Sequence, residues 1–81
     1  MDADTPAAAT VREELHQVEA ELAHLRTTAA ELRRRIGERS DDPTDPAERA
    51  MMITEAEEQE AFIEVLENRR EELLRSLGDH R

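Results

Sequence analysis

The sequence contains no cysteine and no lysine, two glycines, three prolines and a single aromatic residue, Phe62. The lack of cysteine excludes disulfides, zinc ribbons and thiol chemistry. Two glycines are too few for a phosphate-binding loop or a nucleophile elbow. The first residues show neither the basic start nor the apolar run of a secretory signal, and no stretch approaches the ~20 apolar residues of a membrane span. We therefore expect a cytoplasmic protein that uses no cofactor or metal and does not contact membranes.

The chain is short and acidic. Its 81 residues allow one small domain with a thin core, and 40% of them are charged. The net charge of −10 argues against direct binding of nucleic acid, because phosphate contacts need a basic surface. The apolar residues are mostly aliphatic, which is typical of long helices.

A heptad pattern runs through the first half of the chain. Apolar residues recur at alternating spacings of four and three at Val11, Leu15, Val18, Leu22, Leu25, Ala29, Leu32 and Ile36. This narrow apolar seam predicts a helix that packs against another helix as in a coiled coil. Thr5-Pro6 and a capping box from Thr10 to Glu13 both mark possible starts, and Gly37 marks a possible end. We place this helix at about residues 10–37, after a flexible N-terminus of residues 1–9.

A second helix follows after a break at residues 38–45. Asp45 is placed to cap it, and Pro46 occupies the first helical position. Its seam consists of Met52, Ala56, Gln59, Ile63, Leu66, Arg70, Leu73 and Leu77. Gly78 occupies the position after a helix that glycine favours, so we expect a helix over residues 46–77 and a tail of residues 79–81.

The short break predicts that the helices are antiparallel. Folding the chain about residue 41 places Leu32 near Met52, Ala29 near Ala56, and Leu15 near Arg70. The predicted fold is all-α: an antiparallel two-helix coiled-coil hairpin at residues 10–78. The candidate helix-interface residues are Leu15, Val18, Leu22, Leu25, Leu32, Ile36, Phe62, Ile63, Leu66, Leu73 and Leu77.

One seam buries few side chains, and a chain of this size usually needs more burial to fold alone. Ile53, Phe62 and Leu74 widen the stripe on one side and could form a second contact face. We therefore expect self-association, as a homodimer that forms a four-helix bundle.

The polar residues at seam positions allow two interpretations. The Arg70 stem can pack while its head reaches solvent, toward Glu14 or Glu67, or Gln59 and Arg70 can fix the register or the oligomeric state. The histidines do not form a metal site by their spacing, and no catalytic triad can be assembled. We expect no enzymatic activity.

The segment DDPTDPAERA at residues 41–50 is the predicted tip of the hairpin. Its aspartates and prolines are turn and cap residues, which explains them by structure alone. However, a cap needs only one acid, and clustered carboxylates repel one another unless a cation or basic partner receives them. The candidate tip residues for an interaction are Asp41, Asp42, Asp45 and Ala47.

Asp42, Asp45 and Ala47 match a D-x-x-D-x-A pattern, and EEQEAFIE follows in the second helix. Here the hairpin resembles the coiled-coil arm of DksA/TraR-type transcription factors, and the second helix is similar to that of Gre-type cleavage factors. Those proteins insert such an arm into the secondary channel of RNA polymerase. The resemblance implies that Asp42 and Asp45 act near the catalytic metal of the polymerase and that Ala47 is a packing contact. It does not extend to the four-cysteine zinc module of the DksA/TraR family.

Two functions are therefore expected from the sequence. The first is a small acidic coiled-coil interaction protein that binds a second copy of itself. The alternative is a transcription regulator that inserts an acidic tip into RNA polymerase.

Overall fold

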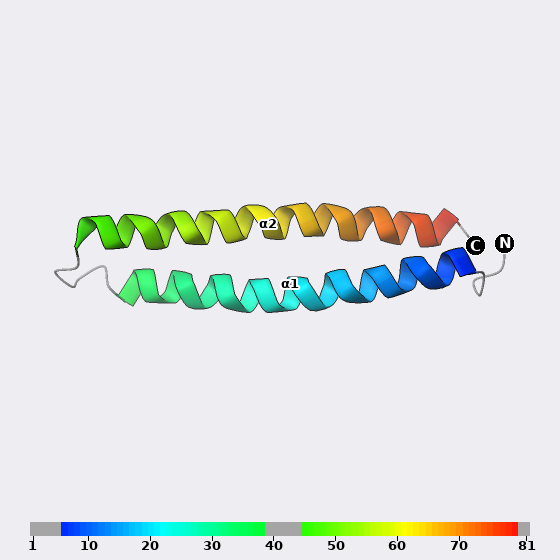
Figure 1. Cartoon of the computed structure of the whole chain (residues 1–81), viewed down its shortest axis with the longest axis horizontal. Coiled ribbons are helices and arrows are strands. Elements are labelled where there is room, and N and C mark those ends of the chain that lie inside the picture. The colour runs from blue at the N-terminus through cyan, green and yellow to red at the C-terminus, as the bar shows by residue number, and fades with distance from the viewer. Residues whose placement is uncertain (1–5, 39–44, 80–81) are drawn as a thin grey trace.

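A computed structural model describes residues 6–38 and 45–79. Two long helices lie side by side and run in opposite directions (Figure 1). Helix α1 spans Pro6–Glu38 and helix α2 spans Pro46–Asp79. The start of α1 and the end of α2 lie at the same end of the molecule, and at the other end α2 reaches beyond α1 (Figure 1). The predicted all-α antiparallel hairpin is confirmed.

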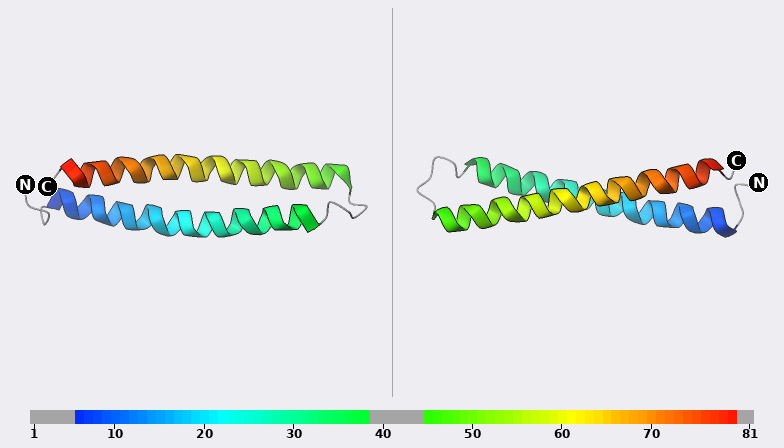
Figure 2. Two further views of the ribbon diagram at one scale, coloured as in Figure 1. Left: turned by 180° about the vertical axis from the view of Figure 1, so that it is seen from behind. Right: turned by 90° about the horizontal axis from the view of Figure 1, so that it is seen from above.

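The molecule is a narrow rod of 61 × 14 × 14 Å. The two helices cross at a shallow angle, as the right-hand view of Figure 2 shows. This geometry is expected when apolar residues repeat every 3.5 residues and the helices wind around each other to keep them in contact. In the described part of the chain, neither helix has an apolar stretch long enough to cross a membrane.

The first helix begins earlier than expected. α1 starts at Pro6, and the Thr10 hydroxyl donates a 3.0 Å hydrogen bond to the Pro6 carbonyl one turn back. Thr10 therefore lies inside the helix, and the capping-box interpretation of Thr10 to Glu13 is wrong. Proline is suited to the first helical position because it has no N–H to leave unpaired there.

The glycines do not terminate the helices in the expected way. Gly78 lies within α2, which continues to Asp79, and Gly37 lies within α1, which continues to Glu38. No glycine in the described segments has a positive φ angle, so neither forms a left-handed cap.

The core is a single line of side chains between the helices. Its buried members are Ala8, Leu15, Val18, Leu22, Ala29, Leu32, Ile36, Ala56 and Leu73. Seven of them form two clusters, one around Leu22 and Leu73 and the other around Leu32 and Ala56. Seven of the nine belong to α1, so α1 turns a more sharply apolar edge toward its neighbour than α2 does.

The register of the hairpin differs from the prediction. Leu32 packs in one cluster with Ala56, and Leu15 in the other with Leu73. Each residue of α1 thus faces a residue about one helical turn further along α2 than expected. Met52 packs against the cluster that contains Leu32, so these two residues are close as predicted, but the tightest partner of that cluster on α2 is Ala56.

Ion pairs on both flanks of the core agree with this register. On one flank Arg33 binds Glu60 at 2.6 Å and Arg26 binds Glu67 at 2.9 Å. On the other flank Glu14 binds Arg69 at 2.6 Å. Residues 26 and 33 are one heptad apart, as are residues 60 and 67, so the same contact repeats along the hairpin.

Candidate functional site

The described part of the predicted tip forms a helix cap. The Asp45 carboxylate accepts a 3.1 Å hydrogen bond from the Ala47 N–H, and the Asp45 carbonyl accepts one from the Arg49 N–H. This is the arrangement that satisfies the first free N–H groups of a helix. Asp41 and Asp42 lie outside the described residues. Because of these hydrogen bonds, Asp45 has a local structural role. Both Asp45 and Ala47 are exposed.

Most of the predicted helix-interface residues face the other helix. Leu15, Val18, Leu22, Leu32, Ile36 and Leu73 are buried, and Leu25, Ile63, Leu66 and Leu77 are half-buried. Phe62 differs from them, because 45% of its surface is exposed. It is not among the residues that form or pack against the two core clusters.

The two polar seam residues behave differently from each other. Arg70 reaches the flank and donates a 3.1 Å hydrogen bond to Glu19, rather than to Glu14 or Glu67 as expected. Gln59 lies at the gap between the two core clusters, and its buried Oε1 atom has no hydrogen-bond partner. An unpaired buried amide oxygen destabilises the hairpin, so Gln59 is a position where stability is lost.

The flanking ion pairs change the pKa values of their members. The hydrogen bond from Arg33 lowers the pKa of the Glu60 carboxyl group, and the same bond raises the pKa of Arg33. Hydrogen bonds to Glu14 and Glu72 raise the pKa of Arg69. These groups are exposed to solvent, and the shifts follow from charge pairing across the hairpin rather than from a buried reactive site.

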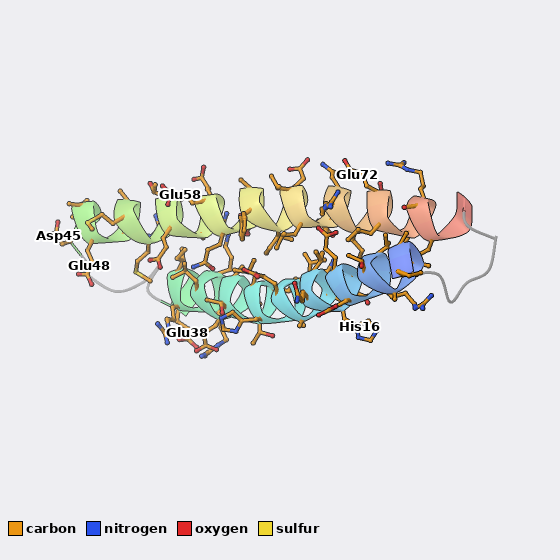
Figure 3. The ribbon with its side chains drawn as sticks, turned by 45° about the vertical axis from the view of Figure 1, so that its right-hand side comes forward. His16, Glu38, Asp45, Glu48, Glu58 and Glu72 are labelled. Atoms are coloured by element: carbon orange, nitrogen blue, oxygen red, sulfur yellow. The ribbon has the colours of Figure 1, made fainter. Side chains whose placement is uncertain are left out.

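The histidines show no sign of a metal site. His16 points away from α2 into solvent, as Figure 3 shows, and His24 is also exposed. His80 lies outside the described residues. Among the residues placed by the structure, no three histidine, aspartate or glutamate side chains come together as metal ligands would.

The surface of α2 carries several large apolar side chains that are exposed to solvent. The large apolar side chains that the structure leaves exposed are Met51, Phe62, Val65 and Leu74, with exposed fractions of 73, 45, 59 and 41%. All four belong to α2. Exposed apolar residues that gather on one element mark interaction sites more often than scattered ones do.

Three of these residues share one side of α2. Met51, Phe62 and Val65 fall on a second heptad line that lies about 100° around the helix from the seam. We call this line the outer stripe; it consists of Met51, Glu55, Glu58, Phe62, Val65, Arg69 and Glu72. Figure 3 shows Glu58 and Glu72 on the side of α2 away from α1.

The second contact face predicted from Ile53, Phe62 and Leu74 is therefore wrong. Ile53 packs against the core, and Leu74 lies about 120° around α2 from Phe62. Met51 and Val65 were missed because the seam had already accounted for the apolar pattern. They can be recognised in the sequence when the same alternating spacings of four and three residues are counted from Met51 rather than from Met52.

A shallow open groove surrounds Met51 at one end of the outer stripe. Its lining residues are Glu48, Ala50, Met51, Met52, Thr54, Glu55 and Glu58. All of them belong to α2, so the groove is a depression along one helix and not a closed pocket. Such a surface suits another helix better than a small molecule, which needs a concave site.

No family model, no curated protein and no solved structure matches this chain.

Proposed function

We propose that this protein is a small acidic helical-hairpin interaction protein without catalytic activity, and that it binds a second copy of itself. The outer stripe of α2 is the surface that makes the contact. The observation that carries the proposal is the exposure of Phe62 and Val65 side by side on the outer stripe of α2. Two hairpins joined in this way form a four-helix assembly.

The thin core supports this proposal. The hairpin buries only one line of side chains, and leaves Phe62, its only aromatic residue, 45% exposed. Removing apolar surface from water contributes about 25 cal/mol per Å², so covering these side chains favours association. Because α1 contributes none of the large exposed apolar side chains of the described segments, we assign the contact to α2.

The test is the oligomeric state of a Phe62→Glu/Val65→Glu variant. We expect the wild-type protein to sediment as a dimer and the variant as a monomer at the same concentration, because two carboxylates replace the apolar centre of the contact. The helix content in circular dichroism should stay the same, since neither residue is part of the core.

The matched control is Ala61→Glu/Asn68→Glu, which adds the same two negative charges at exposed positions outside the outer stripe. It should remain a dimer. A wild-type protein that stays monomeric over the accessible concentration range would contradict the proposal.

A second candidate is the transcription regulator that inserts its tip into RNA polymerase. The observation in its favour is the narrow 61 × 14 × 14 Å rod, in which Asp45 and Ala47 at the start of α2 are exposed. In this alternative Asp42 and Asp45 act on the polymerase, as in the factors that the hairpin resembles.

Capture experiments with Asp42→Asn/Asp45→Asn test this candidate. If the tip is functional, tagged wild-type protein should retain RNA polymerase subunits from a cell extract, and the variant should lose them while keeping its helix content. Asparagine caps helices about as well as aspartate, so the fold is expected to survive. Equal recovery of the polymerase with both proteins, or none with either, would count against the regulator.

A further inference from the structure

The centre of the outer stripe has a self-complementary order. Along α2 it reads Glu58, Phe62, Val65, Arg69: an acid, two apolar residues and a base. A second copy that runs in the opposite direction presents the same four residues in reverse. An interface with two-fold symmetry requires this property, because each contact must occur twice with the roles of the copies exchanged.

We infer that two copies pair through antiparallel α2 helices, with Phe62 packed on Val65 of the second copy and Glu58 paired with Arg69 of the second copy. This inference rests on the proposed self-association. The symmetry axis then passes between residues 62 and 65, and each contact is formed twice. The apolar contacts lie at the centre and the charged pairs on either side of it, as is usual in protein interfaces.

Other ways of pairing the two stripes are less favourable. A parallel arrangement in register places Glu58 against Glu58 and Arg69 against Arg69, which brings like charges together. An antiparallel arrangement shifted by one heptad places Phe62 against Glu58 or Glu72 of the second copy, so a carboxylate meets an aromatic ring. Of these three arrangements, only the proposed one matches apolar with apolar and acid with base at the centre.

The contacts that Glu58 and Arg69 make within the single hairpin are compatible with this pairing. Glu58 makes no ion pair within the described chain and points away from α1 (Figure 3). Arg69 donates hydrogen bonds to Glu14 at 2.6 Å and to Glu72 at 3.1 Å, and its side chain is 44% exposed. A guanidinium group carries five N–H donors, so Arg69 can also bind a carboxylate from a second copy.

Further from the symmetry axis than the Glu58–Arg69 pair, Glu55 lies close to Glu72 of the second copy. This contact is repulsive, but Arg69 already binds Glu72 at 3.1 Å within the same chain and offsets part of its charge. Beyond it, Met51 lies opposite Ser76 of the second copy, so part of the groove around Met51 is covered. The contact is strongest at its centre.

The test compares Glu58→Arg with Glu64→Arg. Both variants change the net charge of −10 by the same amount, and both positions are exposed, but Glu64 lies outside the outer stripe. We expect Glu58→Arg to raise the dissociation constant of the dimer about tenfold, because it loses two symmetric ion pairs and places arginine against Arg69. Glu64→Arg should leave the dimer unchanged or tighten it, since it reduces the repulsion between two acidic chains.

Combining Glu58→Arg with Arg69→Glu should restore association relative to either single variant, because the charges are exchanged and not removed. A wild-type protein that does not dimerise would overturn the proposed function itself. A wild-type dimer in which Glu58→Arg and Glu64→Arg behave alike would leave self-association intact and overturn this pairing.

Distances between spin labels give an independent test of direction. The chain has no cysteine, so single cysteines can carry the labels. In the proposed dimer, labels at Ala61→Cys, which lies outside the outer stripe, are separated by only about 8 Å along the helices, whereas labels at Gly78→Cys are separated by about 40 Å or more. A side chain at Gly78 meets no atom within 4 Å, so the label should not disturb the hairpin. Similar short distances at both positions would indicate parallel helices and overturn the inference.

Discussion

Replacing Leu22 with alanine is expected to destabilise the hairpin by about 2–5 kcal/mol, which is most or all of the stability of so small a domain. Leu22 is 1% exposed and is the only large side chain that the described structure buries completely. It lies in the cluster with Leu15, Val18 and Leu73. Because the core is only one side chain wide, no second layer can move in to fill the cavity.

Urea unfolding followed by circular dichroism measures this effect. Leu74→Ala is the matched control: it removes the same atoms from the same kind of helix, but Leu74 is 41% exposed. We expect the control to lose less than about 1 kcal/mol. All proteins should be compared at one concentration, since association stabilises the folded state by mass action. Equal losses for the two variants would show that Leu22 is not the centre of the core.

The sequence was sufficient to predict the two helices and their antiparallel packing. Helices form through local contacts, and the alternation of four and three from Val11 to Ile36 identifies the buried edge of α1 without any knowledge of its partner. Asp45 and Pro46 mark the start of α2 by hydrogen-bond chemistry that also acts locally, and the Asp45 cap is observed. These features do not depend on distant parts of the chain.

The register could not be obtained in the same way. A heptad pattern repeats, so sliding one helix by a turn still brings apolar residues against apolar residues over most of the seam. The choice depends on side-chain volume at positions such as Ala56 and on which charges meet across the flanks. Arg33 with Glu60 and Arg26 with Glu67 repeat at the spacing of one heptad, and this repetition identifies the register once both helices are in view.

Only part of the outer stripe could be recognised from the sequence. Phe62 was recognised as lying beside the seam, but Met51 and Val65 were not connected with it. Apolar residues on α2 are distributed around the helix, so their assignment to the seam or to a second face depends on where α1 lies. The structure supplies this position, and it shows that Ile53 belongs to the core and that Phe62 does not.

Ala56→Leu tests the observed register directly. In the predicted register Ala56 would face Ala29, and a leucine would fill the space between two small residues. In the structure Ala56 is completely buried against Leu32 and Ile36. The larger side chain therefore has no room, and we expect a loss of about 1–3 kcal/mol in the free energy of unfolding.

The matched control for this prediction is Ala61→Leu, at an exposed position of the same helix outside the outer stripe. It should change the stability by less than about 0.5 kcal/mol, because leucine and alanine both favour helix and the side chain stays in solvent. A stability gain in Ala56→Leu would mean that Ala56 faces another small residue. The helices would then be aligned one turn away, and the ion pairs of Arg26 and Arg33 could not both form as observed. A loss confined to Ala56→Leu is the result that the packing of Leu32 requires.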